Sequence, residues 1–154
     1  MTNRIHPKVL KGQLDNLLHE LAILDVREQG VFAQGHLLFA SNTPLSRLEI
    51  EVPRLVPRRS SPIVLYGDGN EREDLALRAN ELLNHFGYSN VSTLEGGVRG
   101  WRKAGYELFS GINVPSKAFG EFIEETCHTP NITSADLVNL RKTGTDMVIL
   151  DSRP

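Results

Sequence analysis

The fold is decided by the stretch Ile63-Val64-Leu65-Tyr66-Gly67-Asp68-Gly69-Asn70-Glu71-Arg72-Glu73-Asp74. The first four residues read as a buried strand, and apolar spacing predicts a helix after Asp74, with the positions Leu75, Ala79, Leu82, Leu83 and Phe86. A strand that runs through a glycine-bearing loop into a helix N-terminus presents free backbone N–H groups that suit an anion. This loop, however, carries four carboxylates and one arginine, and it has no cysteine, serine or histidine. The stretch therefore predicts an anion-binding framework without a reactive group.

The composition narrows the class of protein. The 154 residues allow one ordinary domain and a remainder, and 40% hydrophobic and 23% charged residues are typical of a globular protein. A net charge of −2 gives no reason to expect nucleic acid or a membrane as partner. The N-terminus has no apolar signal core, so we expect a cytoplasmic protein. The one cysteine, Cys127, excludes an internal disulfide and a multi-cysteine metal site.

Predicted helices and strands alternate through residues 5–110. The predicted strands are Leu21–Leu24, Leu37–Ala40, Ile63–Tyr66 and Val91–Leu94; the predicted helices begin at Pro7, at Asn42 and after Asp74, and a short one carries Trp101. Pro53 should end or kink the second helix near Val52. The alternation predicts an α/β fold, a mostly parallel sheet with helices on both faces. Loops at the carboxyl ends of such strands form the binding crevice, and residues 67–72 belong to one of these loops.

The end of the chain repeats its beginning. Ile132 through Asp151-Ser152-Arg153 echoes Ile5 through Asp25-Val26-Arg27, with 19 positions from Ile132 to Asp151 and 20 from Ile5 to Asp25. A segment of this length cannot bury a core alone. We therefore expect a fragment of a longer tandem protein, organised as a domain over residues 1–112, a linker helix over 113–130, and the first helix and strand of a truncated second repeat over 131–154.

The motifs together resemble a rhodanese domain, the sulfurtransferase module. The matching segments are Leu24–Arg27, His36–Pro44, Ile63–Tyr66 and, most specifically, Leu94-Glu95-Gly96-Gly97-Val98-Arg99-Gly100-Trp101. The second repeat is similar to multi-domain members, in which several rhodanese domains follow one another. This resemblance implies the rhodanese-like parallel sheet already predicted. It also implies a parent protein related to thiosulfate sulfurtransferases.

The resemblance also identifies the site. In the family, the strand before the loop ends in a cysteine that carries a persulfide, and an arginine five residues later frames the loop. These positions are Gly67 and Arg72 here, so the resemblance implies no catalytic residue and a vestigial active-site loop of Gly67, Asp68, Gly69, Asn70, Glu71 and Arg72. The net charge of −3 over residues 67–74 would repel thiosulfate and would raise the pKa of a thiol. We expect no cofactor, and two or three loop carboxylates are a weak metal signal.

The sequence leaves three functions open. The first is a catalytically inactive domain with a structural or regulatory role in a multi-domain sulfurtransferase-like protein. The second is sulfur transfer through an unrecognised thiol, Cys127, or through later domains. The third is a protein-interaction module that uses the acidic loop, residues 67–74. The expected partners are the missing rhodanese domains of the same chain, and residues 131–154 could also pair with a second copy by strand exchange.

Four further residues are interpreted as structural. Asp25 and Arg27 suit an ion pair or loop anchor. His36 is expected to support the end of a strand, because no second histidine lies at a useful spacing for a metal. Trp101 is expected to pack under the Gly96-Gly97 turn.

Overall fold

The computed structural model describes residues 3–16, 20–70, 74–114, 116, 119–120, 123, 127 and 130–150. The chain divides into two units, Met1–Lys117 and Ala118–Pro154. The first unit contains β1 (Asn3–Ile5), α1 (Pro7–Asp15), β2 (Ala22–Asp25), α2 (Gln29–Phe32), β3 (Ser41–Asn42), the 3₁₀ turn η1 (Leu45–Arg47), α3 (Leu48–Leu55), β4 (Ile63–Tyr66), α4 (Leu75–His85), β5 (Val91–Leu94) and α5 (Gly97–Lys103). The second contains α7 (Ser134–Lys142).

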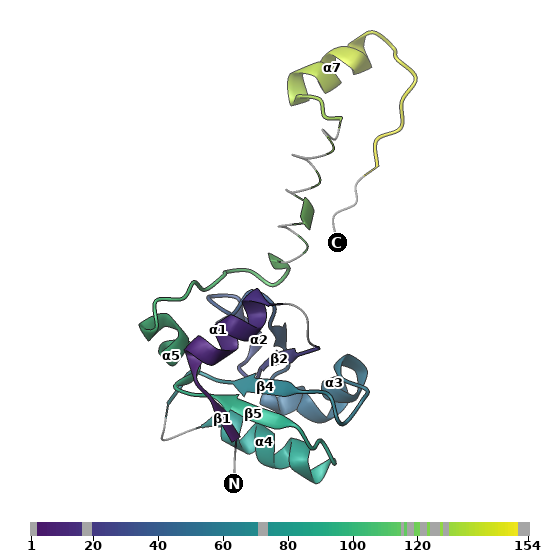
Figure 1. Ribbon diagram of the computed structural model, residues 1–154. Coiled ribbons are helices and arrows are strands. Elements are labelled where there is room, and N and C mark those ends of the chain that lie inside the picture. The colour runs from purple at the N-terminus through teal and green to yellow at the C-terminus, as the bar shows by residue number, and fades with distance from the viewer. Residues whose placement is uncertain are drawn as a thin grey trace. The chain divides into compact units, whose positions relative to one another are not determined.

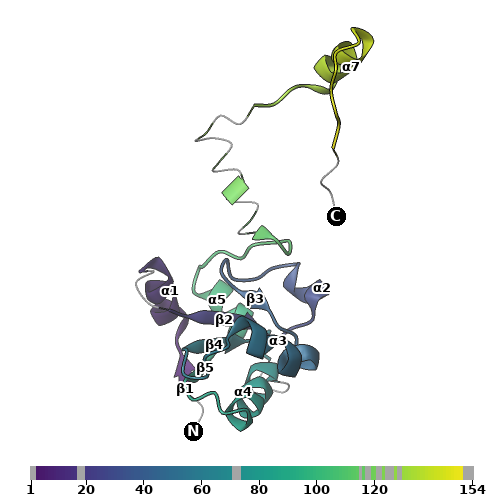
Figure 2. The ribbon, with the colours of Figure 1, turned by 90° about the vertical axis from the view of Figure 1, so that its right-hand side faces the viewer.

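The first unit is built on one parallel sheet with the strand order β1-β5-β4-β2-β3 (Figure 1). The central strand β4 is buried along its whole length, as its run of apolar residues predicts. Helices α3 and α4 cover one face, and α1 and α5 cover the other (Figures 1 and 2). Two core clusters correspond to these faces, one around Leu65 and Leu83 and the other around Leu10 and Trp101. The predicted α/β fold with a parallel sheet and helices on both faces is confirmed.

The prediction of a strand at Leu37–Ala40 is wrong. These residues form a turn, closed by the Ala40 N–H donating to the Leu37 carbonyl at 3.0 Å, and the strand β3 begins only at Ser41. The apolar run resembles a buried strand, but its residues are not buried together: Leu37 is a core residue, whereas Phe39 is half exposed. Sequence analysis also missed β1, whose three residues pair with Ser92–Leu94 of β5.

Helix α3 continues past Pro53, contrary to the expected end near Val52. Pro53 lies near the end of this helix on its exposed side. Because proline has no backbone N–H, the carbonyl of the exposed Glu49 lacks the helical hydrogen bond that residue 53 would donate. The Val56 N–H still donates to the Val52 carbonyl at 2.8 Å and closes the last turn.

The second unit contains a well-capped helix. The Thr133 side chain accepts from the Asp136 N–H while the Asp136 carboxylate accepts from the Thr133 N–H, which is a capping box. The Thr133 hydroxyl also donates to the Asp136 carboxylate at 2.5 Å, and this bond, followed by the one from the Thr133 N–H, lowers the pKa of Asp136. Of the described residues of the expected linker helix, those at positions 114, 116, 119, 120, 123 and 127 are helical, and those at 113 and 130 are not. Phe122, one of its expected apolar positions, lies outside the described residues.

The strand expected at Met147–Leu150 is not formed in the described residues, and because it needs the edge of another sheet to pair with, it stays a prediction. Residues 145–150 belong to no helix or strand, and Val148, Ile149 and Leu150 are exposed. A strand requires a neighbour for its backbone hydrogen bonds, and the described part of this unit contains no other strand. Asp151-Ser152-Arg153, the end of the predicted repeat, lies outside the described residues. The division at residues 112 and 130 stays a prediction.

Within the described ranges, no helix combines the length and the apolar character that a bilayer span requires.

Core packing on the α4 face sets the first prediction. Leu83 of α4 is fully buried, whereas Ile50 of α3 is 72% exposed. Leu83→Ala should lower the free energy of unfolding by about 2–5 kcal/mol, because it leaves a cavity in the core. Ile50→Ala, the matched control on the same face, should lower it by less than about 0.5 kcal/mol. Urea titration measures both, and equal losses would contradict the assigned core.

Candidate functional site

The acidic loop leaves the carboxyl end of β4 at Gly67. The Gly67 carbonyl accepts from the Val98 N–H at 2.9 Å, and the Asp68 carbonyl accepts from the Arg99 N–H at 3.4 Å, so the loop is bonded to the first turn of α5. A Cβ atom built on Gly67 would come no closer than 3.6 Å to a neighbour, the Leu75 Cβ. The backbone at Gly67 therefore accepts a side chain without strain.

The backbone of the loop lies directly against the backbone of the Gly96-Gly97 turn, with no side chain between them. Gly69 has φ +83°, and a Cβ there would lie 1.8 Å from the Gly96 carbonyl oxygen. Gly97 has φ +52°, and a Cβ there would lie 2.3 Å from the Gly67 carbonyl oxygen. Both positions need glycine for the close approach and for the left-handed conformation. The glycines of the loop and of the turn are thus one structural element.

A carboxylate of the chain occupies the N-terminus of α4. Asp74 is the N-cap residue, and its Oδ1 accepts from the Leu77 N–H at 3.1 Å. This contact satisfies one of the free N–H groups of the first turn. Of the predicted loop residues, the structure places Gly67, Asp68, Gly69 and Asn70 together, while Glu71 and Arg72, with Glu73, lie outside the described residues.

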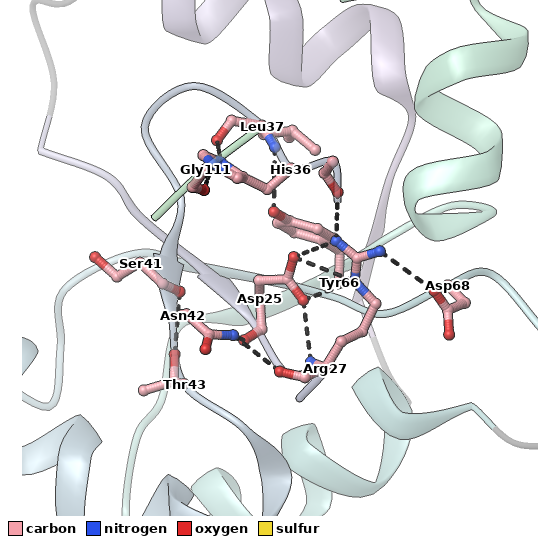
Figure 3. A network of polar contacts seen from close by, with 11 residues as sticks. Asp25, Arg27, His36, Leu37, Ser41, Asn42, Thr43, Tyr66, Asp68 and Gly111 are labelled. Carbon is pink, nitrogen blue, oxygen red and sulfur yellow. Dashed lines mark hydrogen bonds and ion pairs between the residues drawn. The ribbon is translucent and has the colours of Figure 1, made fainter. Parts of the chain in front are cut away.

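A buried ion pair lies directly behind the loop (Figure 3). Asp25 is 0% exposed and Arg27 is 4% exposed; Arg27 Nη2 donates to Asp25 Oδ2 at 2.5 Å, and Nε donates to Asp25 Oδ1 at 2.9 Å. The same guanidinium donates to the Gly35 carbonyl at 2.8 Å and to Asp68 Oδ1 at 3.3 Å. Burial alone would lower the pKa of Arg27, but the hydrogen bonds and charge of Asp25, with Asp68, raise it overall. The predicted structural role of Asp25 and Arg27 is confirmed.

Tyr66, the last residue of β4, belongs to this network, and sequence analysis did not assign it a role. Its hydroxyl oxygen accepts from the Leu37 N–H at 3.2 Å, and the Arg27 guanidinium carbon lies 5.7 Å from the ring centroid. Burial, and then the nearby charge of Asp25, raise the pKa of the Tyr66 hydroxyl far above its ordinary value. A tyrosine that ends an otherwise aliphatic strand was the one available signal.

His36 and Trp101 also make structural contacts. The ring of His36 is buried, stacks on Phe32 at 3.8 Å between centroids, and contacts the carbonyl oxygens of Leu37 at 2.8 Å and Gly111 at 3.0 Å. The Trp101 indole N–H donates to the Glu107 carbonyl at 2.9 Å, and its ring packs in the core. His36 thus has a structural role, but it joins the turn before β3 to residues 109–111 instead of supporting the expected strand.

The remaining candidates form no second site. Cys127 is exposed and belongs to the second unit. In the described part of the chain, no three histidine, cysteine or carboxylate side chains gather as metal ligands.

Comparison with known proteins agrees with this arrangement. The family model of the rhodanese-like domain matches residues 7–104. The crystal structure of thiosulfate sulfurtransferase from Pseudomonas aeruginosa aligns at TM-score 0.90 and 47% identity, covering 99% of this chain and 28% of that one. The structure of the Alr3790 protein from Anabaena aligns at TM-score 0.63 and 29% identity, covering 79% of this chain and 94% of that one.

Two curated relatives match smaller shares of this chain. The uncharacterized protein YqhL of Bacillus subtilis (strain 168) is 34% identical over 79 residues, which cover 51% of this chain and 59% of that protein. The uncharacterized protein slr1261 of Synechocystis is 33% identical over 94 residues, which cover 60% of this chain and 49% of that protein. The chain thus spans only about half of the curated relatives and about a quarter of the Pseudomonas protein.

The close approach of the loop to the Gly96-Gly97 turn predicts that alanine destabilises the protein more at Gly69 than at Gly105, a glycine with the same φ. Gly69 and Gly105 both have φ +83°, but a Cβ on Gly105 would meet nothing within 4 Å. Gly105→Ala should lower the free energy of unfolding by about 1–2 kcal/mol for the left-handed conformation alone. Gly69→Ala should cost about 1–3 kcal/mol more because of the clash with Gly96. Equal losses in urea titrations would show that the backbone contact is absent.

The raised pKa of Tyr66 predicts alkaline instability. Above the ordinary tyrosine pKa of about 10, the unfolded chain loses this proton while the folded chain keeps it. The free energy of unfolding should therefore fall with rising pH by about 1.4 kcal/mol per pH unit from this group. Tyr66→Phe should be less stable at pH 7 by about 1–3 kcal/mol, because the Leu37 N–H loses its acceptor, but should lack this slope.

The matched control for this slope is Tyr106→Phe, which leaves Tyr66 in place and should keep the wild-type slope between pH 10 and 11. Guanidinium titrations of the three proteins at several pH values give the slopes. Identical slopes for wild type and Tyr66→Phe would contradict the burial of a protonated Tyr66.

Proposed function

Because the chain belongs to the rhodanese-like domain family, we propose that it is a non-catalytic domain of a larger sulfurtransferase-like protein, with a structural or regulatory role. One observation carries this proposal: β4 is followed directly by Gly67, the position at which the family resemblance expects the nucleophilic cysteine. Rhodanese chemistry moves sulfur by thiolate attack, and glycine has no nucleophile.

We do not propose that Cys127 replaces the missing cysteine. Cys127 is the one cysteine of the sequence, and it lies exposed in the second unit. A reactive cysteine is activated by a helix N-terminus or by nearby cations. Cys127 instead lies near the C-terminal end of the expected linker helix, residues 113–130, and we assign it no role in sulfur transfer.

The electrostatics of the loop also support a non-catalytic site. An anionic sulfur donor, or a thiolate, would be stabilised by the free N–H groups at the N-terminus of α4. The Asp74 carboxylate already accepts from one of them, and the Asp68 carboxylate is bonded to Arg27 just beside Gly67. Both carboxylates disfavour a second negative charge at this point. The vestigial loop of residues 67–72 is therefore unsuited to sulfur transfer in charge as well as in residue type.

The proposed parent is longer than this chain. The similar Pseudomonas thiosulfate sulfurtransferase is matched over only 28% of its length by almost the whole of this chain. This supports a protein in which further rhodanese domains of the same chain are the partners and carry any catalysis. Residues 131–154 are proposed to begin the next domain and to pair with strands that it supplies.

Gly67→Cys tests whether the missing thiol is the sole deficiency. The position accepts a Cβ with ordinary contacts, so the variant should fold with nearly wild-type stability. Thiosulfate-to-cyanide transfer should stay close to the wild-type background, because Asp68 and Asp74 raise the pKa of the new thiol. The triple variant Gly67→Cys/Asp68→Asn/Asp74→Asn should transfer sulfur about tenfold faster than the single variant or better, since each pKa unit changes the thiolate fraction about tenfold.

Asparagine is chosen at position 74 because it can still cap α4. The matched control is Gly67→Cys/Glu107→Gln, which removes one negative charge away from the loop and should behave as the single variant. Rapid transfer by wild type would overturn the non-catalytic proposal. Rapid transfer by Gly67→Cys alone would overturn the argument from the loop charges.

A further inference from the structure

A hollow of about 310 Å³ lies beside the acidic loop, on the face of the sheet that α4 covers. It is bounded by β1 and β5, by the loop and the Gly96-Gly97 turn, and by the first turn of α4; these elements lie together at one edge of the sheet in Figure 1. The lining side chains that matter are Arg4, Thr93, Glu95 and Asp74. Its volume is at the lower end of the range for small-molecule sites.

One wall of the hollow presents a hydroxyl and a cation. Thr93 is 4% exposed, and its hydroxyl makes no hydrogen bond to any described residue. Arg4 pairs in register with Thr93 on the neighbouring strand, so the two side chains stand on the same face. Among the described residues, Arg4 has no ion-pair partner. No buried side-chain nitrogen or oxygen of the described residues lacks a hydrogen-bond partner, so the Thr93 hydroxyl is accessible from the hollow that this residue lines. A hydroxyl beside an arginine is suited to a carboxylate.

Negative charge also lines the hollow. Glu95 follows β5 directly and has no ion-pair partner among the residues described, and Asp74 caps α4 through one of its two oxygens. A simple anion on Arg4 would be repelled by these carboxylates, and a simple amine near them would be repelled by Arg4. A ligand that carries both charges a few bonds apart can pair its negative group with Arg4 and its positive group with the carboxylates at once.

Gly67 adds no side chain to the lining of the hollow. Gly67 lines it, and a Cβ built there meets only ordinary contacts, the nearest at 3.6 Å. We propose that the hollow binds a small zwitterion of the α-amino-acid class. Its carboxylate lies on Arg4 and Thr93, and its ammonium group faces Glu95 and Asp74. This binding goes beyond the proposed function and does not depend on sulfur transfer.

Three probes of similar size separate the charge requirements: L-alanine, propionate and ethylamine. Each is titrated into the full chain, labelled with ¹⁵N, and amide shifts of Thr93, Glu95 and Gly96 are followed by NMR at constant ionic strength. L-Alanine should bind in the millimolar range. Propionate and ethylamine, which each lose one charged contact and keep one repulsion, should bind about tenfold more weakly or not at all.

Thr93→Val is the decisive variant. Valine has nearly the shape of threonine, so the variant should keep the fold. Its affinity for L-alanine should fall about tenfold. Arg4→Gln should abolish binding, and Arg54→Gln, which removes an exposed arginine of α3, should leave it unchanged.

The proposal is overturned if L-alanine shifts none of these amides, if propionate binds as tightly as L-alanine, or if Thr93→Val keeps the wild-type affinity. Because L-alanine carries no sulfur, none of these results depends on whether the domain transfers sulfur. A chain that binds L-alanine and also transfers sulfur would keep this inference while overturning the non-catalytic function.

Discussion

The pairing of Arg27 with Asp25 holds the functional end of this domain together. One guanidinium, almost fully buried, joins the end of β2 to the Gly35 carbonyl after α2, to Asp68 of the loop and to the ring of Tyr66. The Arg27 carbonyl in turn accepts from the Asn42 side chain of β3 at 2.8 Å. Removing one partner of a buried pair leaves an uncompensated charge, which is strongly destabilising. The carboxyl ends of three strands and the acidic loop are therefore positioned by one residue.

The loop is positioned without help from any side chain at residue 67. Gly69 and Gly97 bring two backbones into direct contact, and α5 donates two N–H groups to the loop carbonyls. Arg27 adds the contact to Asp68. None of these interactions involves the atom that would carry sulfur. The framework of a rhodanese-like site and the chemistry of that site are thus physically separable, and this chain keeps the framework.

The sequence predicted those parts of the fold that local patterns determine. The run Ile63–Tyr66, the helix after Asp74 and the Gly96-Gly97 turn were found because burial, helical spacing and glycine are local signals. The sequence did not predict structure that depends on contacts between residues far apart in the chain. Leu37 resembles a strand residue, yet its N–H is bonded to the Tyr66 hydroxyl 29 positions away. The short β1 exists through pairing with β5, and the run Met147–Leu150 lacks such a neighbour in the described part of its unit.

The central claim is that this chain carries no sulfur at its rhodanese loop. Intact-mass spectrometry after incubation with thiosulfate, with and without later cyanide, tests it most directly. The account predicts an unchanged mass in both samples, since Gly67 offers no thiol and Cys127 is assigned no catalytic role. A gain of one sulfur atom that cyanide removes would contradict it, because that sulfur could only be carried by Cys127, the one cysteine of the chain.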